Sequence, residues 1–145
     1  MKALDELLKS KKYKKIPFQF LKTQHLLLKA EINGVKGRFI LDTGASHSCL
    51  NRDVKDKFLV QTQPSTTTAA GAGAVNMETL LSVKNSLKIG SWKKEEFSIV
   101  LFDLHHVNQA LSTYNVKEVD GIIGADVLMA GEAIIDYAFK KLYLK

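Results

Sequence analysis

Two apolar runs on either side of Asn33-Gly34 constrain the fold of this 145-residue chain more than any other feature. The runs, residues 26–32 and 35–41, consist largely of apolar side chains and are bounded by turn-forming residues. Asn-Gly readily takes the left-handed backbone conformations that a two-residue type I′ turn requires. The sequence therefore predicts a β-hairpin over residues 26–41.

The rest of the chain continues the β pattern, with a few short helices. Strands are predicted over residues 81–89 and 97–102, and a closing hairpin joins residues 133–137 to residues 141–144. Helices are predicted over residues 3–11, 51–58, 104–112 and 125–129, with Asn51 and Asp126 at N-cap positions. We expect a mainly β fold: a basic amphipathic N-terminal helix and linker over residues 1–15, then one domain over residues 16–145.

The charge of the chain is unevenly spread. Six of the first fifteen residues are lysines, and the net charge of the whole chain is +6. No aromatic-interleaved basic stripe, zinc-finger spacing or helix-turn-helix pattern accompanies these lysines, so we expect a solvated helix face and no nucleic-acid partner. Binding of nucleic acid or of an anionic membrane surface through residues 9–15 stays open as an alternative.

Hydropathy and cysteine usage argue against a membrane protein, a secreted protein, a disulfide-bonded protein and a metalloprotein. No apolar stretch approaches the ~20 residues that a membrane-spanning helix needs, and the first residues lack the apolar segment of a secretory signal. Cys49 is the single cysteine, so no internal disulfide can form, and His105-His106 lacks further ligands at metal-binding spacing. We therefore expect a cytoplasmic protein without a metal and without a membrane partner.

Asp42 is the leading candidate for chemistry. It directly follows the predicted strand 35–41, and Gly44 permits a tight loop where the backbone can approach a substrate without a Cβ in the way. The carboxylate is therefore expected to face solvent. Asp120 and Asp126 are weaker candidates for a second carboxylate, because Asp120 precedes a turn glycine and Asp126 occupies the expected N-cap.

A histidine relay is a less favoured interpretation of the same segment. His47 with Asp42, and with Ser46 or Cys49 as the nucleophile, would make a different kind of hydrolase. However, neighbours in sequence seldom converge as a triad. The position of Cys49, before an apolar residue, is more typical of a small buried side chain.

Two motifs in this chain resemble those of a known family. The run Phe39-Ile40-Leu41-Asp42-Thr43-Gly44-Ala45 resembles the hydrophobic-hydrophobic-Asp-Thr-Gly-Ala/Ser signature of the pepsin-like and retroviral-type aspartic peptidases. Ile122-Ile123-Gly124 is similar to their second hydrophobic-hydrophobic-Gly motif. The resemblance covers roughly residues 16–144, and it implies a closed, retropepsin-like acid-protease barrel lobe with one or two short helices.

The resemblance also implies roles for individual residues. Asp42 would be the catalytic carboxylate. Thr43 would bond through its hydroxyl to the other lobe's loop, and the backbone around Gly44 would donate to the carboxylate. Ile123, with its neighbour Ile122, would pack beneath the loop, and Gly124 would let the chain pass close to it.

A single Asp-Thr-Gly implies half an active site per chain. Peptide hydrolysis needs one group that takes a proton from water and another that gives a proton to the substrate. A two-fold homodimer would bring Asp42 and its symmetry mate together, and the two carboxylates would share a proton. The implied function is an aspartic endopeptidase that acts on a polypeptide substrate and needs no cofactor.

Residues 69–74 match the position of the family's flap, a hairpin that closes over bound peptide. Ala70, Gly71, Ala72 and Gly73 would contact the substrate there, with Ala45 beside the catalytic loop. The chain departs from the family in two ways: its flap tip carries alanine where relatives often carry a large apolar residue, and residues 46–49 lack the acidic residue of retroviral enzymes. These departures keep an alternative open, a non-catalytic peptide-binding or dimerisation module of the same fold.

Overall fold

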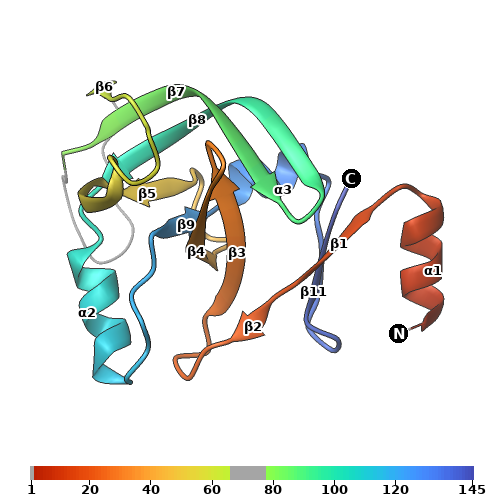
Figure 1. The fold of residues 1–145 in the computed structure, drawn as a ribbon. Coiled ribbons are helices and arrows are strands. Elements are labelled where there is room, and N and C mark those ends of the chain that lie inside the picture. Colours follow the sequence, from red (N-terminus) through yellow and green to blue (C-terminus); the bar gives the residue numbers. More distant parts are fainter. Residues whose placement is uncertain (1, 66–77) are drawn as a thin grey trace.

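Six strands close into a barrel in the computed structural model, which describes residues 2–65 and 78–145 (Figure 1). In ring order the strands are β3 (Leu26–Ile32), β4 (Val35–Leu41), β9 (Gly121–Ile123), β5 (Cys49–Asn51), β8 (Trp92–Phe102) and β7 (Leu80–Ile89). Each strand pairs with the next around the ring, and the pairing between β3 and β7 closes it. The pairs β4–β9 and β5–β8 are parallel and the other four are antiparallel. This mainly β, closed architecture is the predicted fold class.

The β3–β4 hairpin confirms the strongest prediction from sequence. Its strands pair from Leu26↔Leu41 to Ile32↔Val35. Asn33 and Gly34 both have positive φ, 53° and 82°, as a type I′ turn requires. The Asn33 side chain also donates to the Phe58 carbonyl (2.9 Å) and to Asn85 (3.0 Å), so the turn is anchored to its surroundings.

Two segments differ from their predicted bounds. The helix expected over residues 51–58 is a single 3₁₀ turn, η1 (Arg52–Val54), although Asn51 caps it by accepting from the Asp53 N–H at 3.3 Å. The chain after it forms turns that bury Phe58, and Leu59 has φ 58°, which no right-handed helix allows. Strand β8 begins at Trp92, earlier than the expected residue 97, and the short strand β6 (Gln63–Pro64) pairs with β7.

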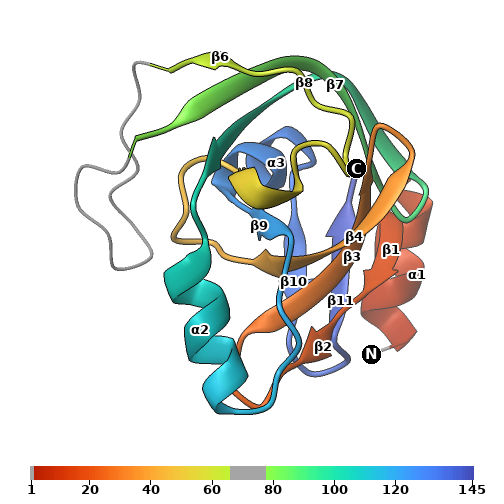
Figure 2. The same cartoon turned by 60° about the vertical axis from the view of Figure 1, so that its left-hand side comes forward.

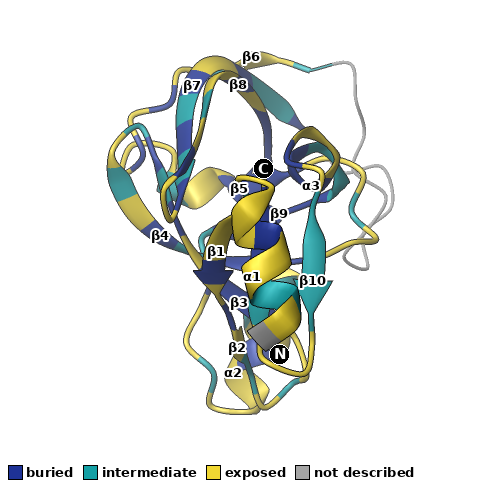
Figure 3. Cartoon of the chain, turned by 90° about the vertical axis from the view of Figure 1, so that its right-hand side faces the viewer, coloured by how far each residue is buried: buried dark blue, intermediate teal, exposed yellow. Residues whose placement is uncertain are grey.

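Three further strands form a second sheet beside the barrel. Its order is β1 (Lys14–Pro17), β11 (Lys141–Leu144) and β10 (Ile134–Asp136), and β2 (Gln19–Phe20) links β1 to the barrel edge at β3. Helix α1 (Lys2–Ser10) lies across the outer side of this sheet (Figure 3). The predicted closing hairpin is therefore confirmed as β10–β11.

Apolar side chains gather in two clusters that the barrel wall separates. The larger fills the barrel and includes Leu28, Phe39, Phe58 and Leu101, all fully buried. Helix α2 (His105–Thr113) lies beside the barrel (Figure 2). Its buried Leu111 belongs to the second cluster, together with side chains from the outer face of the barrel wall. Burial of each such side chain stabilises the fold by roughly 1.5–3 kcal/mol. Strand β4, which leads to Asp42, has side chains in both clusters and is therefore packed on both of its faces. No helix in residues 2–65 or 78–145 is long and apolar enough to cross a membrane.

Candidate active site

Asp42 stands at the point where β4 leaves the barrel. Leu41, the last residue of β4, pairs in parallel with Ile123 at the end of β9. The Asp42 N–H then donates to the Ile123 carbonyl at 2.9 Å, which continues the ladder by one residue. The Asp42 side chain is exposed, as predicted from its place at a strand end.

The loop after Asp42 is folded back on the carboxylate. The Gly44 N–H donates to Asp42 Oδ1 at 2.9 Å, and the Ala45 N–H donates to the Asp42 carbonyl at 3.2 Å. A Cβ at position 44 would lie 3.3 Å from Asp42 Oδ1, so glycine gives the loop the room to fold this tightly. Thr43 is exposed in the single chain, and Ala45 is half-buried.

Gly124 brings the second motif against this loop. The Ala125 N–H donates to the Ala45 carbonyl at 2.7 Å. A Cβ on Gly124 would lie 2.5 Å from the same carbonyl oxygen, so a larger residue would push the two loops apart. Ile123 is fully buried and Ile122 is buried, so both lie below the loop surface. The close passage expected at Gly124 is present.

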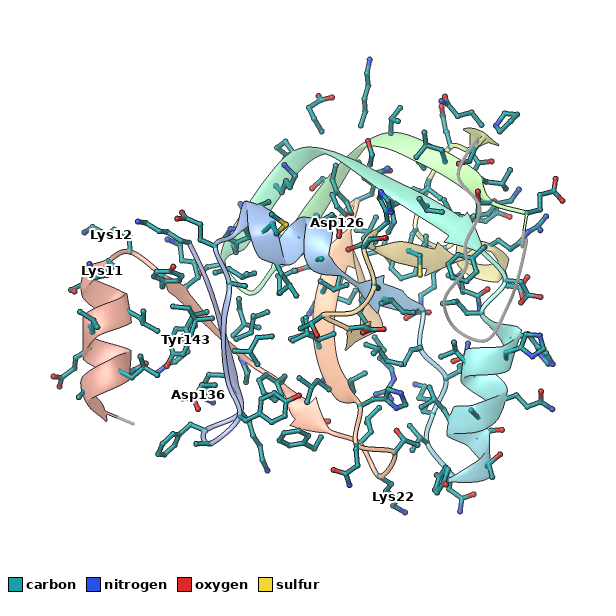
Figure 4. All side chains as sticks on the ribbon, turned by 180° about the vertical axis from the view of Figure 1, so that it is seen from behind. Lys11, Lys12, Lys22, Asp126, Asp136 and Tyr143 are labelled. Carbon is teal, nitrogen blue, oxygen red and sulfur yellow. The ribbon has the colours of Figure 1, made fainter. Side chains whose placement is uncertain are left out.

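A buried hydrogen-bond network joins the two loops, and the sequence did not reveal it. The Ser48 hydroxyl donates to Asp126 Oδ1 at 2.7 Å and accepts from the Gly124 N–H at 2.8 Å. Asp126 Oδ1 also accepts from the N–H groups of Ser48 and Val127. Asp126 was expected at an N-cap, but Gly124 is the N-cap of α3 (Ala125–Ala130) and Asp126 is the helix's second residue (Figure 4). Its carboxylate binds Ser48, in the segment that follows the Asp42 loop.

The comparisons with known proteins agree with this geometry. The Aspartyl protease family model matches residues 28–127, which is more than half of the chain. The chain belongs to the aspartyl protease family. No curated protein sequence matches it.

Solved structures place this aspartyl protease among retropepsin-like folds. A retropepsin-like aspartic protease from Rickettsia conorii has a TM-score of 0.59 and 19% identity, and the match covers 91% of each chain. The retroviral protease-like domain of Ddi1 from Leishmania major has a TM-score of 0.55 and 18% identity over 83% of this chain and 88% of that one. The EIAV protease complexed with the inhibitor HBY-793 has a TM-score of 0.54 and 18% identity over 77% of this chain and 91% of that one.

The other carboxylates near the motifs of this aspartyl protease have structural partners. Asp120 accepts from the Arg38 N–H at 2.9 Å and from the Lys57 amine at 3.3 Å, and it is largely buried. Asp126 is engaged by Ser48, as described above. Neither therefore resembles the exposed Asp42 on its tight loop.

The residues of the histidine relay do not assemble, because no described hydrogen bond joins His47 to Asp42. His47 Nδ1 lies 3.2 Å from Ser46 Oγ, and both side chains are exposed. Cys49 is buried, and burial raises the pKa of its thiol to about 12. At neutral pH the sulfur therefore stays a protonated, unreactive thiol in the second apolar cluster.

Two further expectations concern ligands of the site. The segment expected to form the flap, which includes Ala70, Gly71, Ala72 and Gly73, lies outside the described residues. Within the described ranges, no three His, Cys, Asp or Glu side chains come together in a way that could hold a metal ion.

Proposed function

We propose that this aspartyl protease is an endopeptidase that hydrolyses polypeptides with two Asp42 carboxylates paired across a homodimer. The observation that carries the proposal is the exposed Asp42 on a loop that the Gly44 N–H and the Gly124 motif hold in place. The family match supports the same chemistry. The chain carries one Asp-Thr-Gly, so the second carboxylate is supplied by a second copy.

The chemistry assigns different tasks to the two copies of Asp42. Like charges a few ångströms apart cannot both ionise easily, so the pair shares one proton. The ionised carboxylate takes a proton from the attacking water, and the protonated one donates to the carbonyl oxygen of the scissile bond. In the described part of the chain no hydrogen bond engages Asp42 Oδ2, so this oxygen is available to water or to the partner carboxylate.

The second sheet offers a surface for the second copy. Strand β10 lies at the sheet's edge and pairs, among described strands, with β11 alone (Figure 3). An edge strand readily adds another strand. Exposed apolar side chains flank it, Met129 (79% exposed) on α3 and Tyr137 (63%) and Phe139 (55%) in the turn that follows β10. Contact with a second copy would cover this strip, which we call the β10 strip.

The test compares wild type with Asp42→Asn and with Asp56→Asn on an unfolded protein substrate from mildly acidic to neutral pH. Asp56→Asn is the matched control, because Asp56 is exposed and lies outside the site. New fragments are followed by mass spectrometry. We expect cleavage by wild type and Asp56→Asn, and a loss of at least about a thousandfold for Asp42→Asn.

Other outcomes have definite meanings. Undiminished activity of a folded Asp42→Asn variant would remove Asp42 from the mechanism. Absence of cleavage by wild type, together with saturable binding of the same substrate, would favour the non-catalytic peptide-binding module.

A further inference from the structure

A cationic groove lies on the outer face of the β3–β4 hairpin, away from Asp42. The groove has a volume of about 710 Å³, and its walls are residues 16–19 of the β1–β2 segment and the loop that contains Lys117 and Glu118. Asp42 does not line it. On β4 the lining ends at Arg38, four positions before Asp42, and on β3 it reaches Leu27, which pairs with Ile40. None of residues 42–45 lines the groove. The groove is therefore separate from the candidate active site.

The strand register places like charges side by side in this groove. Lys29 and Arg38 are directly opposite each other in the β3–β4 pairing. The next row brings Lys36 and Lys88 to the two sides of Glu31, and all five residues line the groove. Like charges directly opposite on a sheet are destabilising. The fold thus tolerates a local repulsion at Lys29 and Arg38 that a bound anion would relieve.

The carboxylates of the groove leave part of this positive charge uncompensated. Glu31 pairs with Lys88 at 4.0 Å, and Asp120 pairs with Lys57 at 3.3 Å. The Arg38 guanidinium donates to the backbone carbonyls of the 117–118 loop, which carry no full charge. Among the described ion pairs, none includes the lining residues Lys29, Lys36 and Lys117.

We propose that this groove binds an acidic segment of a polypeptide. In this groove the amines alternate with Glu31, Glu118 and Asp120, and carboxylates spaced along a peptide can contact the amines between these acids. A nucleic acid carries a phosphate at every nucleotide, so some of its phosphates would lie against the acids and be repelled. Among the described residues of the groove Phe18 is the one aromatic, and it is 4% exposed, so no ring is available for base stacking. Pro17, an exposed lining residue, offers apolar surface to the side chains between the acids.

The test measures binding of a fluorescent peptide of repeating Glu-Ser-Leu-Asp by anisotropy, in the Asp42→Asn background so that the probe stays intact. The matched probe is Gln-Ser-Leu-Asn, which removes the charge alone. We expect saturable binding of the acidic probe, weakening as salt rises. The amide probe is expected to bind at least about tenfold more weakly.

Two charge reversals locate the site. Lys29→Glu is expected to weaken binding about tenfold, because one attraction becomes a repulsion. It also places a carboxylate opposite Arg38, so the protein should unfold at no lower urea concentration than its parent. Lys22→Glu makes the same change in net charge at an exposed turn outside the groove (Figure 4) and should change binding less than about twofold.

Three results would overturn the proposal. The first is that Lys22→Glu and Lys29→Glu weaken binding of the acidic probe equally, and the second is that the acidic probe does not bind. The third is that a single-stranded oligonucleotide binds more tightly than the acidic probe and that Lys29→Glu abolishes this binding. The last result would make the groove a nucleic-acid site. Because the probe is read in the Asp42→Asn background, none of these results depends on whether the chain is a peptidase.

Discussion

At the scale of single residues, Ser48 connects the two motifs on which the site depends. Its hydroxyl uses one hydrogen bond for Asp126 and another for the Gly124 N–H, and the side chain is completely buried. An unpaired N–H or carboxylate oxygen in a buried place costs free energy that water cannot restore. Ser48 therefore holds the Gly124 motif against the loop that carries Asp42.

Ser48→Ala is expected to lower the free energy of unfolding by roughly 2 kcal/mol, because the Gly124 N–H loses its acceptor while Asp126 loses a donor. Urea unfolding with an unchanged m-value measures the loss. Ser46→Ala is the matched control, since Ser46 is exposed, and it should stay within about 0.5 kcal/mol of wild type. Equal stability of the two variants would contradict this role for Ser48.

The same residues show where sequence reasoning succeeded and where it failed. The exposed place of Asp42, the tight loop at Gly44 and the close passage at Gly124 could be predicted, because each lies in a short recognisable motif. Their part in catalysis stays a prediction. The Ser48–Asp126 pair could not be, because its members are 78 positions apart and a single hydrogen bond leaves no periodic pattern in the sequence. Asp126 instead matched a local signal, the helix N-cap, and that interpretation was wrong.

At the scale of elements, the strands and helices with clear apolar periodicity appeared as predicted, and β8 shows why others shifted. Its first half carries four charged residues over 93–96, three of them exposed, so apolar and polar residues do not alternate there in the sequence. Trp92 nevertheless starts the strand, because it is buried and its indole N–H donates to the Lys145 carbonyl at 3.1 Å. Such a tertiary contact decides a boundary that local pattern leaves open.

Helix α1 is held to the second sheet by a small polar contact. The Tyr143 hydroxyl donates to Asp5 Oδ1 at 3.0 Å, and Lys15 pairs with the same carboxylate at 3.1 Å. The hydrogen bond from Lys15, followed by that from Tyr143, lowers the pKa of Asp5. Burial, followed by the bond to Asp5, raises the pKa of Tyr143 to about 12. The contact therefore needs a neutral tyrosine beside an ionised aspartate.

Tyr143→Phe is expected to lower the free energy of unfolding by about 1 kcal/mol at neutral pH. Because folding raises the pKa of Tyr143 from 10 to about 12, its contribution is complete below pH 10 and is lost as pH rises through about 12. Urea unfolding should show the two proteins converging over that range. Tyr137→Phe, at an exposed tyrosine, is the control; a constant gap between wild type and Tyr143→Phe up to pH 12 would contradict the assignment.

At the scale of the whole molecule, the barrel closes within one chain, whereas the site that we propose needs two. The barrel and its two apolar clusters need no second copy, whereas the proposed chemistry needs a second Asp42. The count of Asp-Thr-Gly motifs in the sequence predicts pairing but cannot say which surface pairs. For the pairing surface we propose the β10 strip, because β10 is an edge strand and Met129, Tyr137 and Phe139 are exposed apolar side chains.

The β10 strip is therefore expected to control both assembly and activity. Met129→Asp with Phe139→Asp should leave the monomer folded, because both side chains are exposed in it, while a buried pair of charges would disrupt the dimer. Sedimentation should show a shift from dimer to monomer, and cleavage activity should fall at least about tenfold. Leu59→Asp is the matched control, since Leu59 is 67% exposed and lies outside the β10 strip.

Enzyme dilution separates pairing from a chance effect of the two substitutions. If the active species is the dimer, wild-type specific activity falls as the protein is diluted below its dissociation constant, because the dimer concentration then follows the square of the monomer concentration. The curve of specific activity against protein concentration should have the same shape for the double variant but lie at higher protein concentration. The curve of Leu59→Asp should coincide with that of wild type. A specific activity that stays constant while sedimentation shows only monomer would mean that one Asp42 suffices, and the half-site argument would then be wrong.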